Sequence, residues 1–198
     1  NWIASKDLLA NAIEHDVERF VFSSTCSNYG KMKDPEAFVD EESALSPVSH
    51  YARLKVQFEE HLIETANSKY ICGTALRFAT VYGISPRMRF DLTVNEFTKE
   101  IALGRTMEVY GEQFWRPYCH VSDFSRAFRL VLESDASLVD GEVFNVGDTT
   151  ENYNKKMLID VILNQLSQGK VEYVVKDEDP RDYRVNFEKI KNVLGFNI

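Results

Sequence analysis

A tyrosine and a lysine four residues apart, Tyr51 and Lys55, have the types and spacing that most directly suggest chemistry. They fall in a segment expected to be helical from about residue 49 to 66, where residues i and i+4 share a face. A free tyrosine has a pKa of about 10, and a nearby cation lowers it by roughly 1–3 units. We therefore predict that Lys55 makes Tyr51 usable as a proton acceptor near neutral pH.

This spacing alone is weak evidence. With nine tyrosines and 12 lysines among 198 residues, chance supplies roughly half a match. A second match joins Tyr29 to Lys33, but it falls in a predicted glycine-containing loop, where residues i and i+4 need not meet. A surface helix carrying a half-buried tyrosine and a solvated lysine is the structural alternative for Tyr51 and Lys55.

Hydroxyl side chains precede the pair. The apolar run at 19–24 predicts a buried strand that ends in Ser23, Ser24 and Thr25. A second predicted strand covers 69–78. Strands that alternate with helices predict an α/β fold with a parallel sheet, and such sheets bind ligands at the carboxyl ends of their strands. We therefore expect Thr25 to lie on the ligand side of the sheet.

Periodicity and turn residues predict the remaining elements. Helices are expected at 3–15, 91–103, 122–134, 154–167 and 187–194, and strands at 107–110, 116–121, 143–146 and 171–175. We interpret residues 1–84 as the C-terminal part of a Rossmann-like cofactor domain. Residues 85–198 then form a smaller mixed α/β substrate lobe, of which 105–150 partly return to the sheet.

Composition excludes several functional classes. The net charge of −8 argues against a broad basic surface for nucleic acid, and no apolar run approaches the roughly 18 residues that span a bilayer. No cysteine or histidine spacing indicates a metal site. Reduced thiols in a cytoplasmic protein are the simplest interpretation of the three separated cysteines, Cys26, Cys72 and Cys119.

At this point the sequence resembles the extended short-chain dehydrogenase/reductase family, the nucleotide-sugar epimerases and dehydratases. The resemblance covers nearly the whole chain and rests on five motifs in order. These are Phe22-Ser-Ser-Thr25-x-x-x-Tyr29-Gly30, Pro47-x-Ser-x-Tyr51-x-x-x-Lys55, Leu76-Arg77-Phe78-x-x-x-Tyr82-Gly83, Arg116-x-Tyr118-x-His120-Val121-x-Asp123 and Phe144-Asn145-Val146-Gly147.

The resemblance implies a catalytic centre. Thr25 would hydrogen-bond the reacting sugar hydroxyl, and Tyr51 would take or return its proton. Lys55 would hold the nicotinamide ribose of NAD and tune Tyr51, with Ser23 also in the cofactor site. NADP is the alternative cofactor. Hydride would pass between the cofactor and a sugar carbon.

The resemblance also implies a site for the nucleotide part of the substrate. Arg116 would meet the diphosphate, because a guanidinium can bond two phosphate oxygens. Arg181, Thr80 and Asn95 fall in regions that contact substrate in the family. A surface arginine and an ordinary helical asparagine are the structural alternatives. Family members commonly form homodimers. The two predicted helices that flank the first strand carry apolar residues, Leu9, Phe58 and Leu62, beyond what a single core face needs, so a homodimer is predicted.

The sequence departs from the family in two respects. Dehydratases carry Asp-Glu after the catalytic threonine, but Cys26 and Ser27 stand here. This favours a 4-epimerase or a ketoreductase over a dehydratase. The family's glycine-rich phosphate loop, GxGxxG, is also missing. We therefore expect the later part of a longer enzyme, inactive alone, and a non-catalytic nucleotide-sugar-binding fragment is the alternative.

Overall fold

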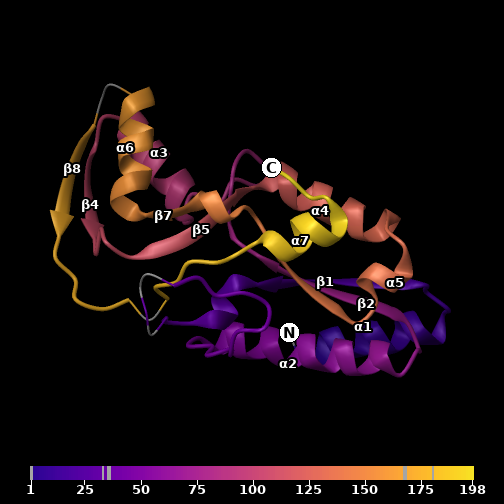
Figure 1. Ribbon diagram of the computed structural model, residues 1–198. Helices are drawn as coiled ribbons and strands as arrows, with labels where there is room; N and C mark the ends of the chain where they lie inside the picture. The colour runs from indigo at the N-terminus through magenta and orange to yellow at the C-terminus, as the bar shows by residue number, and fades with distance from the viewer. Residues whose placement is uncertain (1, 33, 35–36, 167–168, 180) are drawn as a thin grey trace.

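A computed structural model describes residues 2–32, 34, 37–166, 169–179 and 181–198. Its largest element is a three-stranded parallel sheet with strand order β1-β2-β6 (Figure 1). In the register, Thr25 pairs with Phe78, and Phe78 pairs with Val146, so the three strands end level with one another. The strands are β1 (Arg19–Thr25), β2 (Cys72–Phe78) and β6 (Glu142–Val146).

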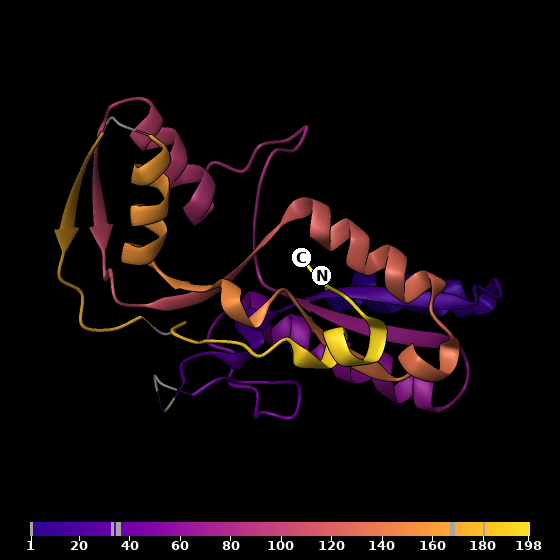
Figure 2. The same cartoon turned by 45° about the horizontal axis from the view of Figure 1, so that its top comes forward.

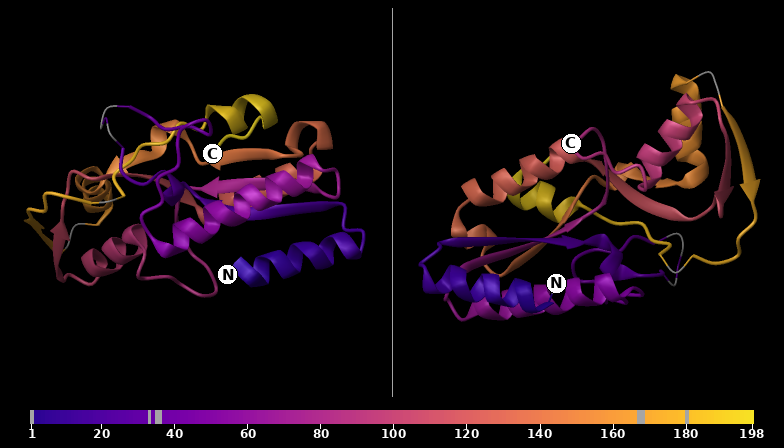
Figure 3. Two further views of the ribbon diagram at one scale, coloured as in Figure 1. Left: turned by 90° about the horizontal axis from the view of Figure 1, so that it is seen from below. Right: turned by 180° about the vertical axis from the view of Figure 1, so that it is seen from behind.

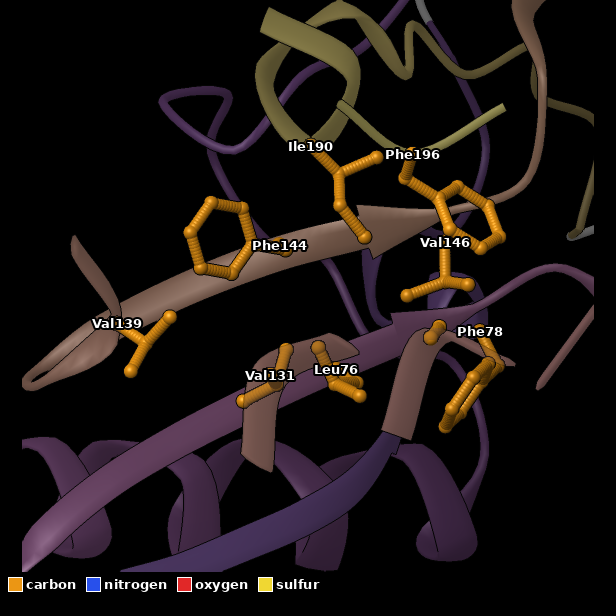
Figure 4. Packing of buried hydrophobic residues seen from close by; sticks show 9 residues of the cluster. Leu76, Phe78, Val131, Val139, Phe144, Val146, Ile190 and Phe196 are labelled. Carbon is orange, nitrogen blue, oxygen red and sulfur yellow. The ribbon is translucent and has the colours of Figure 1, made fainter. Parts of the chain in front are cut away.

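Helices cover both faces of this sheet (Figure 3). On one face, α1 (Trp2–Glu14) and α2 (His50–Asn67) bury an apolar cluster against β1. On the other, α4 (Val121–Glu133), α5 (Ala136–Val139) and α7 (Glu188–Leu194) pack on β2 and β6. Figure 4 shows this second cluster, in which Leu76, Phe144 and Ile190 are completely buried. The three layers hold the carboxyl edge of the sheet rigid.

A smaller lobe projects beyond that edge (Figure 2). A second small sheet leads into it, and the lobe has its own apolar core around Phe97, Ile101 and Ile159. The connecting strands are β3 (Thr80–Tyr82), β5 (Trp115–His120) and β7 (Asn152–Asn154), and the lobe contains α3 (Thr93–Ala102), β4 (Thr106–Tyr110), α6 (Lys155–Gln165) and β8 (Lys170–Val174).

The predicted α/β fold with a Rossmann-like parallel sheet is confirmed. The elements that the sequence analysis missed are too short for a periodic pattern, namely β3, β7, α5 and the 3-10 turns η1 (Cys26–Tyr29) and η2 (Thr149–Glu151). Because β6, α4 and α7 pack with the first sheet, later residues contribute to both parts of the molecule. The boundary near residue 84 stays a prediction. Lys33 and residue 167, the predicted end of a helix, lie outside the described residues.

The apolar residues that were assigned to a dimer surface lie inside the chain instead. Leu9, Phe58 and Leu62 are 2%, 1% and 0% exposed, because they fill the core between α1, α2 and β1. That part of the interpretation is wrong. The apolar side chains that α1 does expose are Ile3 and Leu8. Among the described helices, none is both long and apolar enough to cross a bilayer.

Candidate active site

The start of α2 positions Tyr51 and Lys55. The Ser49 hydroxyl accepts a hydrogen bond from the Ala52 backbone N–H at 3.1 Å and so caps the helix. Tyr51 falls in the first turn, and Lys55 follows one turn later. The Lys55 ammonium donates to the Ser23 carbonyl at 2.6 Å and lies 5.6 Å from the centre of the Tyr51 ring. The pair therefore meets the carboxyl end of β1.

The predicted effect of Lys55 on the pKa of Tyr51 stays a prediction, and burial acts in the opposite direction. Burial raises the pKa of Tyr51 above its ordinary value and lowers the pKa of Lys55. The cause is partial burial, which disfavours both the charged phenolate of Tyr51 and the charged ammonium of Lys55. Burial thus favours the protonated phenol of Tyr51 over the phenolate.

A cavity of about 300 Å³ opens beside this pair. Its lining includes Tyr51 and Lys55 of α2, Leu8 of α1 and Phe22 of β1. Tyr51 is 49% exposed, and of the three N–H groups of Lys55, one is bonded to Ser23. The cavity thus offers a phenol and ammonium donors to a polar ligand.

Thr25 caps the turn that follows β1. Its hydroxyl accepts from the Ser27 backbone N–H at 3.1 Å and donates to the Ser27 hydroxyl at 3.2 Å. The Tyr183 hydroxyl donates to the same Ser27 oxygen at 3.5 Å. Cys26 points away from these groups, because its buried thiol donates to the Arg77 carbonyl at 3.1 Å. Burial raises the pKa of that thiol, so Cys26 is a neutral structural residue.

A buried ion pair fixes α2 to the sheet. Arg77 of β2 donates from Nε to Glu59 at 3.0 Å, and a second nitrogen of its guanidinium donates to the same carboxylate oxygen. Arg77 also donates to the Tyr29 hydroxyl at 3.0 Å, which in turn donates to Asn145 at 2.7 Å. Glu59 lies one helical turn after Lys55, so this network sets the position of the catalytic helix.

This network around Arg77 was not predicted from the sequence. The available signals were an arginine inside the apolar run of β2 and a glutamate four residues after Lys55. A second carboxylate, Glu41, accepts from the Asn145 backbone N–H at 2.6 Å. Burial raises the pKa of Glu41.

Arg116 lies in a second polar group, beyond the end of the sheet. Its Nη2 donates to the Asp179 carboxylate oxygens at 3.2 and 3.1 Å. The side chains are 13% and 9% exposed. Arg181 is half exposed, with its Nε 3.9 Å from Asp179. Burial by itself would raise the pKa of Asp179. The nearby cations outweigh this effect and hold that pKa below its usual value; they are Arg116, Arg181 and Lys155.

Tyr183 joins the two groups. Its hydroxyl reaches Ser27 beside Thr25, and its ring centre lies 5.8 Å from the Arg116 guanidinium. The structure therefore brings Ser23, Thr25, Tyr51 and Lys55 to the end of β1, and it connects them to Arg116 through a buried aromatic side chain. Asp179 and Tyr183 were both missed as site residues, because each lies in a charged tail far along the chain from its partners.

Asn95 and Thr80 lie away from these contacts. The Asn95 side chain accepts from the Gly83 backbone N–H and donates to the Arg89 carbonyl, both at 3.1 Å. Asn95 thus clamps the loop between β3 and α3. It also lines a cavity of about 630 Å³ between α3 and α6, which Thr25, Tyr51, Lys55 and Arg116 do not line. Thr80 is half-buried at the start of β3, paired with Tyr118.

Metal chemistry has no support among the described residues, since no group of three or more histidine, cysteine, aspartate or glutamate side chains could hold an ion there.

Comparison with known proteins identifies the family. A model described as the NAD dependent epimerase/dehydratase family matches residues 1–147. The chain belongs to this family. It is 30% identical over 200 residues to a dTDP-glucose 4,6-dehydratase of Streptomyces niveus, with 100% of this chain and 57% of that protein covered. It is 32% identical over 198 residues to an uncharacterized UDP-glucose epimerase, YtcB, of Bacillus subtilis (strain 168), with 98% and 60% covered.

Solved structures agree with this assignment. MoeE5 in complex with UDP-glucuronic acid and NAD has a TM-score of 0.86 at 25% identity, and 100% of this chain covers 65% of that chain. The UDP-glucose 4-epimerase of Thermotoga maritima has a TM-score of 0.83 at 27% identity, with 98% and 63% covered. The chain therefore spans about 57–65% of the length of these relatives.

The residues present suit part of an NAD site. Lys55 and Tyr51 offer hydrogen-bond donors beside a cavity, as the hydroxyl-rich ribose of a nicotinamide nucleotide requires. The segment that holds a pyrophosphate in dinucleotide-binding folds, a glycine-rich turn before a helix, has no counterpart in this sequence.

Proposed function

We propose that this chain is the substrate-binding and acid–base part of an NAD-dependent 4-epimerase acting on a nucleotide-linked sugar. NAD supplies the hydride acceptor and donor when it is bound. The observation that carries the proposal is that Lys55 bonds the Ser23 carbonyl two residues before Thr25, and that Thr25 is connected through Ser27 and Tyr183 to Arg116. One end of this path suits proton transfer, and the other suits a phosphate.

The residues at the end of β1 divide the acid–base work. Tyr51 exchanges a proton with the sugar hydroxyl that is oxidised and re-formed. Thr25 orients that hydroxyl, because its own oxygen retains acceptor capacity after bonding Ser27. Lys55 and Ser23 line the nicotinamide ribose. Burial favours the protonated phenol of Tyr51, whereas the Lys55 ammonium, 5.6 Å from the ring centre, favours the phenolate that would take up the proton.

The groups beyond the sheet bind the nucleotide diphosphate. Arg116 supplies the main contact. Arg181 is half exposed beside it, so a change of rotamer can bring its guanidinium to a second phosphate. Thr80 and Asn95 shape the substrate lobe, Asn95 by holding the loop that follows Gly83.

Dehydratase activity is the second candidate, since a relative at 30% identity is a 4,6-dehydratase. Removal of water needs an acid and a base beside the sugar. Cys26 is buried and bonded to a main-chain carbonyl, and Ser27 is a neutral hydroxyl. These residues favour epimerisation, or the related reduction of a ketosugar by NAD(P)H, over dehydration.

Product analysis tests the proposal. The protein, expressed from its complete reading frame, is incubated with NAD and UDP-glucose or dTDP-glucose, and the sugars are identified by NMR. A C4 epimer is the expected product. A 4-keto-6-deoxy sugar would contradict the epimerase assignment, whereas nucleotide-sugar binding without any turnover would favour the non-catalytic fragment.

We also infer a homodimer in the cytoplasm, in keeping with the reduced cysteines. The exposed Ile3 and Leu8 of α1 support a helical interface. Gel filtration tests it: we expect a dimer that Leu8→Glu converts to a monomer, and a wild-type protein that elutes as a monomer would contradict the inference.

A further inference from the structure

Lys155, at the start of α6, stands among other cations. Arg116, Lys176 and Arg181 all act on its charge, and Asp179 is the acidic group that offsets them. In a chain with a net charge of −8, three positive side chains, Arg116, Arg181 and Lys155, act on the Asp179 carboxylate. Like charges held together raise the energy of the fold, so this arrangement suits a ligand that brings negative charge.

Strand pairing between β5 and β7 brings the start of α6, and with it Lys155, near Arg116. In the antiparallel register of β5 and β7, Arg116 pairs with Tyr153. Lys155 lies two residues further along, just past the end of β7 and at the first position of α6. Consistently, its ammonium lies 6.0 Å from the centre of the Phe114 ring, which is two residues before Arg116.

The Lys155 side chain is also fixed. Its ammonium donates to the Tyr110 carbonyl at 2.5 Å, and the residue is half-buried. One bond to a carbonyl leaves the charge of the ammonium uncompensated and two of its N–H groups for other acceptors. Burial lowers the pKa of Lys155, as expected for a cation that lacks a carboxylate of its own.

A lysine is also poorly placed for helix stability here. Lys155 and Lys156 occupy the first turn of α6, which holds no acidic residue, although cations are unfavourable at a helix N-terminus. Lys156 is exposed, and its backbone N–H donates to the Glu112 carbonyl. Only Lys155 faces the Arg116 cluster, so the two lysines form a natural matched pair.

We propose that Lys155 is a further diphosphate-binding residue, which acts with Arg116 and Arg181 on the nucleotide diphosphate of the substrate. The inference rests on the proposed function, because it names one more contact of the same site. The negative charge of the bound diphosphate neutralises the positive charges that Asp179 neutralises only in part.

Isothermal titration calorimetry tests this on the protein and on its Lys155→Met, Lys155→Arg and Lys156→Met variants. The probes are UDP, inorganic pyrophosphate, uridine and NAD. We expect Lys155→Met to weaken UDP and pyrophosphate about tenfold, equivalent to about 1.4 kcal/mol. Lys155→Arg should restore affinity, and Lys156→Met should change it less than about twofold. Uridine and NAD affinities should not depend on Lys155.

Each other outcome has a distinct meaning. Equal UDP affinity in Lys155→Met, with circular dichroism of a folded protein, overturns the inference and leaves the proposed function standing. Pyrophosphate binding that depends on Lys155, with UDP binding no better, supports the anion site but contradicts a nucleotide-sugar substrate. Loss of NAD affinity instead of UDP affinity overturns the inference, because Lys155 would then serve the cofactor. No binding of either anion contradicts both proposals.

Discussion

Arg77 and Arg116 are both largely buried arginines that bond a carboxylate, yet their surroundings differ. Arg77 is 5% exposed, and its guanidinium bonds Glu59 and Tyr29, with Glu41 nearby. Arg116 bonds Asp179, and two further cations, Arg181 and Lys155, act on the same carboxylate. The charge of Arg77 is neutralised by the fold, whereas the charge around Arg116 remains in excess. Local charge balance thus separates an arginine that holds the structure together from one suited to a ligand.

The largest stability effect is expected at Arg77. Arg77→Met leaves Glu59 buried and unpaired, although one oxygen of that carboxylate already lacks a partner in the described part of the chain. Breaking a buried pair in this way costs about 3–5 kcal/mol. Urea unfolding measures the loss. Arg116→Met is the matched comparison and should cost less than half as much, because Arg181 and Lys155 still face Asp179. Equal losses would break the distinction between the two arginines.

The next effect is on binding. Arg116→Gln removes a charge-assisted contact worth about 1.5–3 kcal/mol, so UDP affinity should fall roughly 10- to 100-fold. Calorimetry at constant salt measures it. Arg105→Gln is the control, since Arg105 pairs with Glu100 on the surface of the lobe. If UDP affinity survives in Arg116→Gln, the cation excess serves some other purpose.

The smallest effect is on the acid side of the stability profile, and it has opposite signs in the two regions. The folded pKa of Asp179 is lowered from 3.8, so its stabilisation is present above that pH and is lost as the pH falls below it. The folded pKa of Glu41 is raised from 4.5, so its stabilisation is present below that pH and is lost as the pH rises through the folded value.

Thermal unfolding of two variants between pH 3 and 7 checks these signs. Asp179→Asn should be less stable than the wild type at pH 7 and should approach it near pH 3. Glu41→Gln keeps the bond from the Asn145 backbone N–H and should gain relative stability as the pH rises. Parallel curves for wild type and both variants would show that neither carboxyl has the shifted pKa described above.

The elements of the fold that depend on a local sequence pattern could be predicted from the sequence. Alternating strands and helices predicted the parallel sheet, and Ser49 marks the start of the helix that carries Tyr51. Contacts between distant segments could not be foreseen, such as Arg116 with Asp179, 63 residues later. The same limit applies to the pKa of Tyr51, because spacing brings Lys55 near but cannot reveal how far the fold buries either side chain.

Burial also could not be assigned from composition. Leu9, Phe58 and Leu62 looked surplus to one core because the contribution of Phe20 and Phe22 from β1 to the same cluster was not counted. Asn95 matched a family position for substrate contact, but both ends of its side chain bond the main chain of its own loop.

The most direct test of the account is the turnover of Tyr51→Phe beside that of Arg116→Gln, in the protein expressed from its complete reading frame with NAD and UDP-glucose. Tyr70→Phe, whose ring is 69% exposed elsewhere, is the control. We predict that Tyr51→Phe lowers kcat by about 10²–10⁴ with KM nearly unchanged, whereas Arg116→Gln mainly raises KM. Full turnover by Tyr51→Phe would contradict the central claim that this side chain exchanges the proton of the sugar.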